Sequence, residues 1–393
     1  MNYKIYHPTK VVECEINLPS SKSISNRLLI IQSQCEEDFS IENLSDSDDT
    51  KTLQKALNST ENIIDVHAAG TSFRFLTAYL STLVGKEFIL TGSERMKNRP
   101  IKDLVDALLK LGANIEYLEK ENFPPLKISG TNMEGGEVKI DGDISSQFIS
   151  SLLLIAPILK KGLKLTIERE LVSKPYIKMT LDIIKEFGIS YIWEGNKIEI
   201  KSQTYLAKNY TVEADWSAVS FWHEIAALSE SCIIKLNGLS ENSIQGDKKV
   251  MELFEGLGVK SEFKKDTLIL TKNDSHSFPK QINLLSTPDL YQSLKCTLHA
   301  YNLSPEITGL QTLKDKETDR VFAVDKELKK LSTLKVIETY KDHRMAMSFA
   351  PLCLKYGELQ INNTEVVSKS YPNFWKDLEK GGFIISPLSG SNN

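Results

Sequence analysis

Cations and hydroxyls crowd one short stretch near the N-terminus. The nine residues Pro19–Arg27 (PSSKSISNR) contain two cations, Lys22 and Arg27, and four serines. The preceding segment, Val11–Leu18, is rich in β-branched and apolar residues and predicts a strand, whereas Leu28–Ile31 continues as an apolar helical run. A strand-to-helix turn offers unpaired N–H groups and the positive end of a helix dipole, which favour an anion. The stretch is therefore typical of a phosphate site.

A plainer interpretation of the same stretch stays open. Ser21 or Ser23 could serve only as a helix cap, with Lys22 and Arg27 in solvent. The chain has no GxxxxGK[ST] sequence, so the stretch is not a Walker loop.

Further cations stand at expected helix starts. Glu94–Pro100 (ERMKNRP) precedes an amphipathic helix, and Asp342–Arg344 precedes the apolar run Met345–Phe349. A cation at a helix N-terminus is unfavourable unless an anion neutralises it. Lys316–Arg320 (KETDR) mixes both signs, and a salt-bridged helix face is its plain interpretation. We interpret Ser45–Thr50 (SDSDDT) as an acidic helix cap rather than a catalytic carboxylate pair.

Composition indicates an enzyme-sized globular protein. The 393 residues, 41% of them hydrophobic, favour two domains. A formal net charge of -4 argues against a broad nucleic-acid or acidic-membrane surface. Five cysteines lie singly, without metal-ligand spacing, and are expected as buried thiols in a reducing compartment. No signal-like or long apolar segment is found, so a cytoplasmic protein without a membrane partner is expected.

An internal repeat is the main clue to architecture. Three segments share an amphipathic helix, a glycine that ends it and a short strand: Leu104–Tyr117, Leu181–Ile192 and Val250–Phe263. Their glycines, at 112, 188 and 258, recur about every seventy residues, which suggests a repeated α/β unit. About six such units would fill the chain, three to each domain. Lys272–Ser277 is expected as a loop and Ser386–Asn393 as a frayed tail.

Taken in order, these motifs closely resemble the 5-enolpyruvylshikimate-3-phosphate synthase family over nearly the whole chain. The matching stretches are SKSISNR (21–27), AGT (69–71), RMKNRPI (95–101), SSQF (145–148), VSKPYI (172–177), SIQGD (243–247), KETDR (316–320), DHRMAM (342–347) and SKSYPNF (368–374).

The resemblance implies a reaction and its substrates. The 5-hydroxyl of shikimate 3-phosphate would add to C2 of phosphoenolpyruvate, and the tetrahedral intermediate would then lose phosphate, on the shikimate pathway to the aromatic amino acids. No cofactor or metal is implied, because phosphoenolpyruvate itself carries the activated group. The resemblance also implies a monomer.

Site residues follow from positions within the matched motifs. The family pattern implies phosphoenolpyruvate contacts by Lys22, Gly70, Arg99, Gln147, Arg320, Arg344 and Lys369. It implies shikimate 3-phosphate contacts by Lys22, Ser23, Arg27, Ser145, Ser146, Gln147, Ser173, Tyr176, Asp289 and Lys316. Asp289 matches the aspartate proposed as the base, Glu317 matches the glutamate proposed to shuttle a proton, and Lys22 could share in proton transfer; the three are not ranked. A helix cap after Pro288 and a salt bridge are the structural alternatives for Asp289 and Glu317.

Two departures affect amide contacts only. Ala68 stands where the family commonly has asparagine before Ala-Gly-Thr, and Thr312 replaces the usual asparagine four residues before Lys316. The charged set is complete, and the response to glyphosate stays open.

The family fold consists of two similar domains, each built from three βαββαβ-type units as an inside-out α/β barrel, with the substrates in the cleft between them. It implies one domain at 19–212, a second joining 1–18 to 213–393, and hinges near 18–19 and 212–215. Shikimate 3-phosphate is expected to close the cleft.

Two rival functions remain. UDP-N-acetylglucosamine enolpyruvyl transferases share the fold but usually carry a cysteine in the loop corresponding to Thr91–Pro100, where this chain has none. The second rival is a non-catalytic binder of phosphate ligands, for which Asp289 and Glu317 beside anions would have no use.

Overall fold

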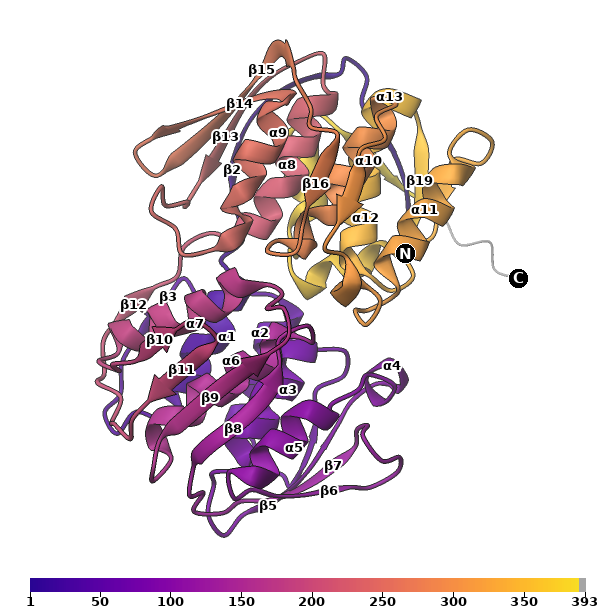
Figure 1. Cartoon of the computed structure of the whole chain (residues 1–393). Helices are drawn as coiled ribbons and strands as arrows, with labels where there is room; N and C mark the ends of the chain where they lie inside the picture. The colour runs from indigo at the N-terminus through magenta and orange to yellow at the C-terminus, as the bar shows by residue number, and fades with distance from the viewer. Residues whose placement is uncertain (389–393) are drawn as a thin grey trace. The chain divides into compact units, whose positions relative to one another are not determined.

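The structure is a computed structural model that describes residues 1–388, the side chains of 274–276 excepted. The chain forms two compact units (Figure 1). Unit 1 comprises Met1–Ser21 and Glu213–Asn393, and unit 2 comprises Lys22–Val212. Each unit is described below by itself.

Unit 2 contains two complete repeats, each with two helices and a four-stranded sheet. The first comprises β4 (Ile63–Asp65), α3 (Gly70–Leu80), β5 (Glu87–Thr91), α5 (Lys102–Lys110), β6 (Asn114–Tyr117) and β7 (Leu126–Ser129). The second comprises β8 (Gly136–Asp141), α6 (Ser146–Ile155), β9 (Leu163–Glu168), α7 (Lys174–Glu186), β10 (Ile192–Glu194) and β11 (Lys197–Ile200). In both, the first two strands are parallel and the fourth lies antiparallel between the second and third.

Unit 1 contains two repeats with the same strand order. The first comprises β2 (Val11–Asn17), α8 (Trp216–Leu228), β13 (Ser231–Asn237), α9 (Val250–Glu255), β14 (Leu257–Lys264) and β15 (Thr267–His276). The second comprises β18 (Val336–Ile337), α12 (His343–Phe349), β19 (Leu359–Asn362), α14 (Phe374–Lys380), β20 (Ile384–Pro387) and, from the start of the chain, β1 (Asn2–Tyr6). The N-terminal strand thus completes the last repeat.

A shorter third repeat, with two parallel strands, is present in each unit. In unit 2 it comprises β12 (Tyr210–Thr211), α1 (Lys22–Gln32), β3 (Ile41–Glu42) and α2 (Asp48–Leu57). In unit 1 it comprises β16 (Gln281–Asn283), α10 (Tyr291–Ala300), β17 (Glu306–Thr308) and α11 (Arg320–Lys330). The prediction of three α/β repeats in each half is confirmed.

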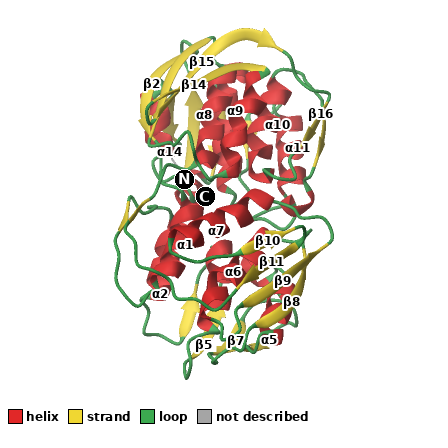
Figure 2. Cartoon of the chain, turned by 60° about the vertical axis from the view of Figure 1, so that its left-hand side comes forward, coloured by secondary structure: helices red, strands yellow, loops and turns green. Residues whose placement is uncertain are grey.

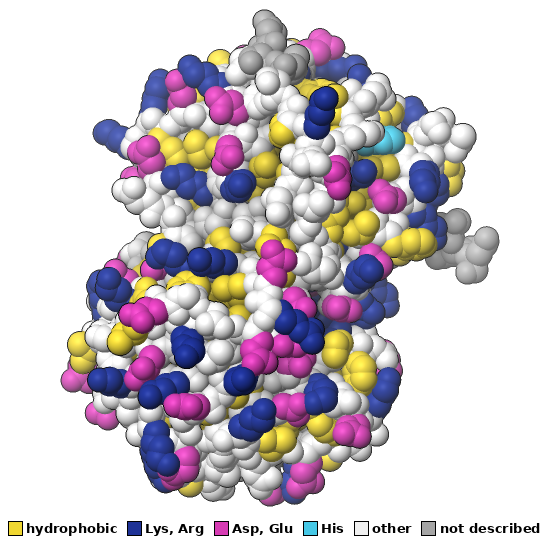
Figure 3. Space-filling view, in the orientation of Figure 1, with side chains coloured by type: hydrophobic (Ala, Val, Ile, Leu, Met, Phe, Trp, Pro, Cys, Tyr) yellow, Lys and Arg dark blue, Asp and Glu magenta, His cyan; other side chains and the backbone are white. Residues whose placement is uncertain are grey.

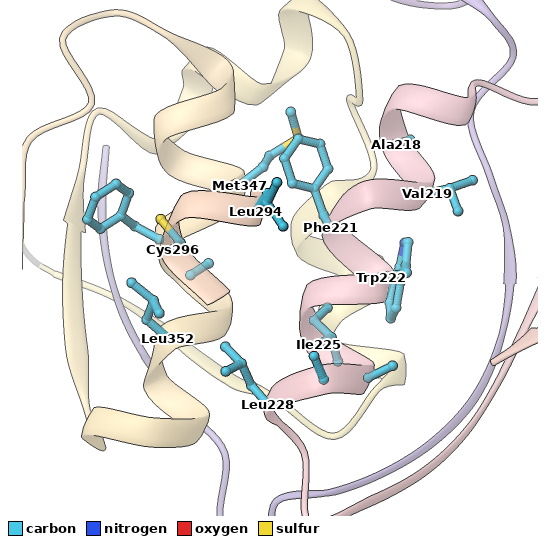
Figure 4. Packing of buried hydrophobic residues seen from close by; sticks show 14 of the residues in the cluster. Ala218, Val219, Phe221, Trp222, Ile225, Leu228, Leu294, Cys296, Met347 and Leu352 are labelled. Atoms are coloured by element: carbon cyan, nitrogen blue, oxygen red, sulfur yellow. The ribbon is translucent and has the colours of Figure 1, made fainter. Parts of the chain in front are cut away.

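The helices lie inside each unit and the sheets outside (Figure 2). Every residue of Ile24–Ile31 in α1, Phe148–Ile155 in α6 and Ala218–Leu228 in α8 is buried. Because these helices are buried on all sides, apolar residues are not confined to one stripe of each helix. The polar residues within them, such as Arg27 and Glu224, are buried as well. Figure 4 shows Phe221 of α8 pointing toward Leu294 of α10 and Met347 of α12 in the core of unit 1, while Trp222 projects from another side of α8.

Two of the three repeat glycines take the predicted role. Gly112 and Gly188 follow the C-caps of α5 and α7 with φ values of +101° and +84°. Because a side chain is strained at these angles, glycine is the residue that lets the chain leave the helix and enter the next strand. Gly258 (φ +81°) does not end its helix: α9 is capped by Gly256, and Gly258 is the second residue of β14, at a shift in the register of its pairing with β15.

Two sequence predictions were wrong. Lys272–Ser277 is not a loop, because residues to His276 belong to β15, where Lys272 is paired with Val259. Ser386 and Pro387 belong to β20 and pair with β1, while the rest of the predicted tail, 389–393, lies outside the described residues. Both segments were polar enough to suggest loops, but backbone pairing decides their structure, with the neighbouring strand β14 for Lys272 and with the distant strand β1 for Ser386 and Pro387.

Surface charge is mixed in sign on the face shown in Figure 3, where basic and acidic side chains alternate. All five cysteines are free thiols; three are buried, as predicted, and Cys14 and Cys35 are half-buried. Within residues 1–388, no helix is long and apolar enough to cross a membrane.

Candidate active site

In unit 2, the predicted site residues gather at helix N-termini. Lys22 and Ser23 begin α1, Gly70 begins α3, and Ser146 begins α6. Each of these helix starts presents backbone N–H groups and a positive dipole end. Neighbouring α1, α3 and α6 therefore combine backbone donors with cations, which is the arrangement that binds phosphate and carboxylate groups.

Lys22 has an acidic partner that the sequence did not reveal. Its Nζ lies 3.1 Å from Oδ2 of Asp49, which is 7% exposed on α2. Ser47 caps α2 by accepting a hydrogen bond from the Thr50 N–H, so Ser45–Thr50 is the helix cap that we predicted. Asp49, in addition, holds the Lys22 ammonium in place.

Arg27 is largely committed to the protein interior. Its Nε donates to Thr180 Oγ1 (2.8 Å) and its Nη1 to the Ser23 carbonyl (2.7 Å), while Nη2 donates to Ser150 Oγ (3.2 Å) and the Tyr176 carbonyl (3.1 Å). Burial lowers the pKa of Arg27 to about 10, so the group remains charged at neutral pH. Four of the five guanidinium N–H groups are thus used: one within α1 and three that join α1 to α6 and α7.

Gly70 lies directly against Arg99. A Cβ at Gly70 would lie 2.4 Å from Arg99 Nη1 and 3.2 Å from Arg74 Nη1. Arg74 also donates to the Gly70 carbonyl at 3.1 Å. Glycine is therefore required for two guanidinium groups to approach the start of α3, where they add to its positive end.

The remaining residues of unit 2 lie at the starts of α6 and α7. Ser145 caps α6 by accepting from the Gln147 N–H, and the Gln147 amide donates to Thr71 Oγ1 at 2.9 Å. Ser173 precedes α7 in a left-handed conformation (φ 53°, ψ 36°) with no side-chain cap. This left-handed conformation is uncommon in a non-glycine residue. Tyr176 lies in the first turn of α7.

In unit 1, the predicted residues form one ionic network around Asp289. Arg320 Nη1 donates to Asp289 Oδ1 (2.9 Å) and Arg344 Nη2 to Oδ2 (3.1 Å), while Lys316 Nζ lies 3.8 Å away. Arg344 Nη1 also donates to the Asp289 carbonyl at 3.0 Å. Three cations from segments far apart in sequence thus converge on one carboxylate.

Glu317 extends this network to Lys369. Its Oε2 accepts from Arg320 Nη2 and its Oε1 from Lys369 Nζ, both at 2.9 Å. Asp342, fully buried at the start of α12, accepts from Arg320 Nε at 2.7 Å and from the Arg344 N–H at 2.9 Å. Each of the four cations therefore has a carboxylate beside it.

The network controls the protonation of its carboxylates. Burial raises the pKa of Asp289, but Arg344, Lys316 and Arg320 outweigh it and hold that pKa far below its usual range. Asp289 is therefore ionised at neutral pH, the state that a proton acceptor needs, although the same cations lower its basicity. In contrast, burial first and then the charge of Asp289 raise the pKa of nearby Asp247 to about 6.

Known proteins show the same organisation. The model of the family described as EPSP synthase (3-phosphoshikimate 1-carboxyvinyltransferase) matches residues 54–378. A curated 3-phosphoshikimate 1-carboxyvinyltransferase of Bacteroides fragilis is 46% identical and is matched over 98% of this chain and 99% of its own length. The chain belongs to the EPSP synthase family.

A more distant relative and solved structures agree. The family member from Psychromonas ingrahamii is 35% identical, covering 96% of this chain and 99% of that protein. A solved EPSP synthase from Acinetobacter baumannii, 20% identical, superposes with a TM-score of 0.77 and covers 98% of this chain and all of its own. At that identity the superposition establishes the EPSP synthase fold.

Sequence reasoning assigned the cations of this EPSP synthase family member but missed three of their acidic partners, Asp49, Asp247 and Asp342. Asp342 and Asp247 lie inside motifs that were noted, DHRMAM and SIQGD, without a role being given to either. Only the folded structure pairs them with groups from other segments.

Proposed function

We propose that this protein transfers the enolpyruvyl group of phosphoenolpyruvate to the 5-hydroxyl of shikimate 3-phosphate and releases phosphate, as a step of the shikimate pathway. The observation that carries the proposal is the ionised carboxylate of Asp289, surrounded by Arg320, Arg344 and Lys316. A site that must bind phosphates and carboxylates and also accept a proton needs both signs of charge side by side. The curated relatives that bear the name of this activity are matched over nearly their whole length.

The reaction is an addition followed by an elimination. In the addition, the 5-hydroxyl oxygen bonds to C2 of phosphoenolpyruvate, its proton is taken up by a base, and a proton is delivered to C3. In the elimination, C3 loses a proton, the bond between C2 and the phosphate oxygen breaks, and phosphate leaves. The products are an enol ether and one inorganic phosphate.

The carboxylates supply the base chemistry in this proposal. Asp289 accepts the hydroxyl proton, since it is ionised and half-buried. Glu317, held between Arg320 and Lys369, and Lys22, beside Asp49, share the proton transfers at C3. The geometry does not rank the last two.

The remaining residues bind the substrates. The two substrates together carry two phosphates and two carboxylates, so guanidinium groups suited to paired hydrogen bonds have a use. Those proposed for phosphoenolpyruvate are Lys22, Gly70, Arg99, Gln147, Arg320, Arg344 and Lys369. Those proposed for shikimate 3-phosphate are Lys22, Ser23, Arg27, Ser145, Ser146, Gln147, Ser173, Tyr176, Asp289 and Lys316. The proposal thus requires residues of both units for one reaction. We also propose that the protein is a monomer and acts in the cytoplasm.

The hydrogen bonds of Arg27 within unit 2 limit how it can bind shikimate 3-phosphate. With four N–H groups used within unit 2, it contributes to shikimate 3-phosphate at most through the fifth, and through the placement of Ser23, whose carbonyl it binds.

Phosphate release tests the proposal. The purified protein is mixed with phosphoenolpyruvate and either shikimate 3-phosphate or UDP-N-acetylglucosamine. Phosphate release with shikimate 3-phosphate, but not with UDP-N-acetylglucosamine, supports the proposal. Release with the UDP-sugar, but not with shikimate 3-phosphate, assigns the chain to the rival transferase. Binding of both substrates without release would favour a non-catalytic binder.

A further inference from the structure

Two segments connect the units, and both are held by one glutamine. The chain leaves unit 1 after Ser21 and returns at Glu213. We call Pro19–Ser21 and Glu213–Trp216 the crossing segments. They lie antiparallel, with a bridge between Ser20 and Ala214 and hydrogen bonds from the Ser21 N–H to the Glu213 carbonyl (2.9 Å) and from the Asp215 N–H to the Pro19 carbonyl (2.8 Å).

Gln245, from the SIQGD motif, joins the crossing segments by its side chain. Its Oε1 accepts from Ser21 Oγ (2.9 Å) and the Trp216 N–H (3.2 Å). Its Nε2 donates to Glu213 Oε1 and to the Ala214 carbonyl, both at 2.8 Å. All four hydrogen-bonding positions of the amide are therefore used, on both segments.

The orientation of this amide is fixed by its partners. Ser21 Oγ and the Trp216 N–H need an acceptor, while the Ala214 carbonyl and Glu213 carboxylate need a donor. An amide turned by 180° would place donor against donor at Trp216 and oxygen against oxygen at Ala214. Gln245 is 5% exposed and Ser21 is fully buried, so water offers no replacement.

Ser21 is the residue directly before Lys22, one of the residues assigned to both substrates. We propose that Gln245 is a positioning residue: by locking the two crossing segments to each other and to unit 1, it fixes the point from which Lys22 and α1 begin. The turnover part of this inference rests on the proposed function. The structural part concerns unit 1 alone and does not.

Hydrogen exchange of the full-length protein tests the structural part. Replacement of Gln245 by methionine keeps the side-chain length but removes all four hydrogen bonds. The Ser21 and Asp215 amides are expected to exchange about tenfold faster, the equivalent of one lost buried hydrogen bond. Unchanged exchange in a folded variant would overturn the inference.

A matched control comes from Gln203, whose side chain also bridges backbone groups, at Ser190 and Lys201, within unit 2. Gln203→Met is expected to leave exchange in the crossing segments unchanged. Faster exchange there in both variants would show general loosening and would count against a specific role for Gln245.

Gln245→Glu gives a readout that simple loss of packing would not produce. It places a second carboxylate against Glu213, whose pKa is already raised by burial, with Asp215 on the same segment adding negative charge. Two carboxylates in contact share one proton, so one pKa rises further. The exchange defect should therefore be largest at alkaline pH and decrease as pH falls, whereas a pH-independent defect would contradict the network.

Turnover completes the test. For Gln245→Met, kcat for phosphate release is expected to fall about 10- to 100-fold, because a small displacement of a reacting group has an effect of that size. Wild-type turnover alongside faster exchange would overturn the link to Lys22. If wild-type protein releases no phosphate, the proposed function fails, and the exchange experiment still decides whether Gln245 holds the segments.

Discussion

Except for Lys22, which lies beside Asp49, the site cations of unit 1 and those of unit 2 have different partners, although both units are built from the same repeat. In unit 1, Arg320, Arg344 and Lys369 are bound by carboxylates. In unit 2, Arg27 is bound by hydroxyls and backbone carbonyls, and Arg99 lies against Gly70 at a helix start. Under the proposed function, the carboxylates that accept protons therefore belong to unit 1, whereas Lys22 and most of the proposed substrate contacts belong to unit 2.

The scaffold explains why this division is possible. Central helices in both units begin with residues of the predicted site, such as Ser146 on α6 and Arg344 on α12. Helix N-termini favour anions in either unit. Of the carboxylates added in unit 1, Asp289 is neutralised by Arg320 and Arg344, whereas Asp342 pairs with the Arg320 guanidinium and accepts from the Arg344 backbone N–H.

The largest expected effect is on catalysis in unit 1. Asp289→Asn keeps the shape of the side chain but removes the proton acceptor, so kcat should fall about 10²- to 10⁴-fold. Asp325→Asn, at a 46% exposed carboxylate of α11 that lies 3.8 Å from Lys295, is the control and should retain full activity. Near-normal turnover of Asp289→Asn, measured by phosphate release, would show that Asp289 is not the proton acceptor and would contradict the role proposed for the carboxylates of unit 1.

Stability should be the main property affected by Arg27 in unit 2. Arg27→Met removes the four hydrogen bonds that this buried guanidinium donates, and should lower the free energy of unfolding by about 3 kcal/mol. The melting temperature should fall by about 6–12 °C. Arg169→Met removes a 65% exposed arginine and should change stability by less than about 1 kcal/mol. An equally small change for Arg27→Met would show that Arg27 is not bound internally.

A buried carboxyl away from the site gives unit 1 a pH dependence of stability. Glu224 on α8 is fully buried, neither carboxyl oxygen has a hydrogen-bond partner, and burial raises its pKa well above the usual range. Since the folded state holds a proton that the unfolded state releases above its ordinary pKa of 4.5, stability is lost as pH rises.

Glu224→Gln replaces the titrating carboxyl with an amide that does not titrate. The difference in the free energy of unfolding between variant and wild type should therefore grow by about 1.4 kcal/mol for each pH unit above the ordinary glutamate pKa of 4.5. His223, with its pKa lowered by burial to about 4, is present in both proteins and cancels from the difference. Urea unfolding from pH 5 to 7 measures the effect, with exposed Glu230→Gln as control. Parallel pH profiles for Glu224→Gln and wild type would contradict a protonated Glu224.

The smallest expected effect concerns the close approach at Gly70. An added Cβ would displace the Arg99 guanidinium, so Gly70→Ala should raise KM for phosphoenolpyruvate about tenfold, equivalent to about 1.4 kcal/mol. If the methyl group acts through Arg99, the effects of Gly70→Ala and Arg99→Lys should not add. If the effects of the two substitutions on KM were additive, the methyl group would not act through Arg99.

Much of the fold was readable from local sequence. Gly112 and Gly188 marked helix ends because glycine adopts the positive φ angles there without strain. The pairing of β1 with β19 and β20, which joins residues more than 350 positions apart, has no local signal. Lys272 was misassigned for a different reason: its segment is polar, although it pairs with the neighbouring strand β14.

The site shows the same limit. The types and spacing of the cations were sufficient to indicate anionic ligands, but not which carboxylate or carbonyl would hold each cation. Lys22 with Asp49 and Arg320 with Asp342 are pairs formed by tertiary structure alone. Arg27 was predicted as a substrate contact, whereas most of its donors serve the protein.

The most direct test of the account follows the reacting carbon. Phosphoenolpyruvate labelled with ¹³C at C2 is incubated with shikimate 3-phosphate and the protein, and NMR records the carbon while free phosphate is measured. The account predicts that the C2 signal moves to that of an enol ether, with one phosphate released for each molecule converted. Phosphate release with the label appearing as pyruvate, or no change in the C2 signal, would contradict it.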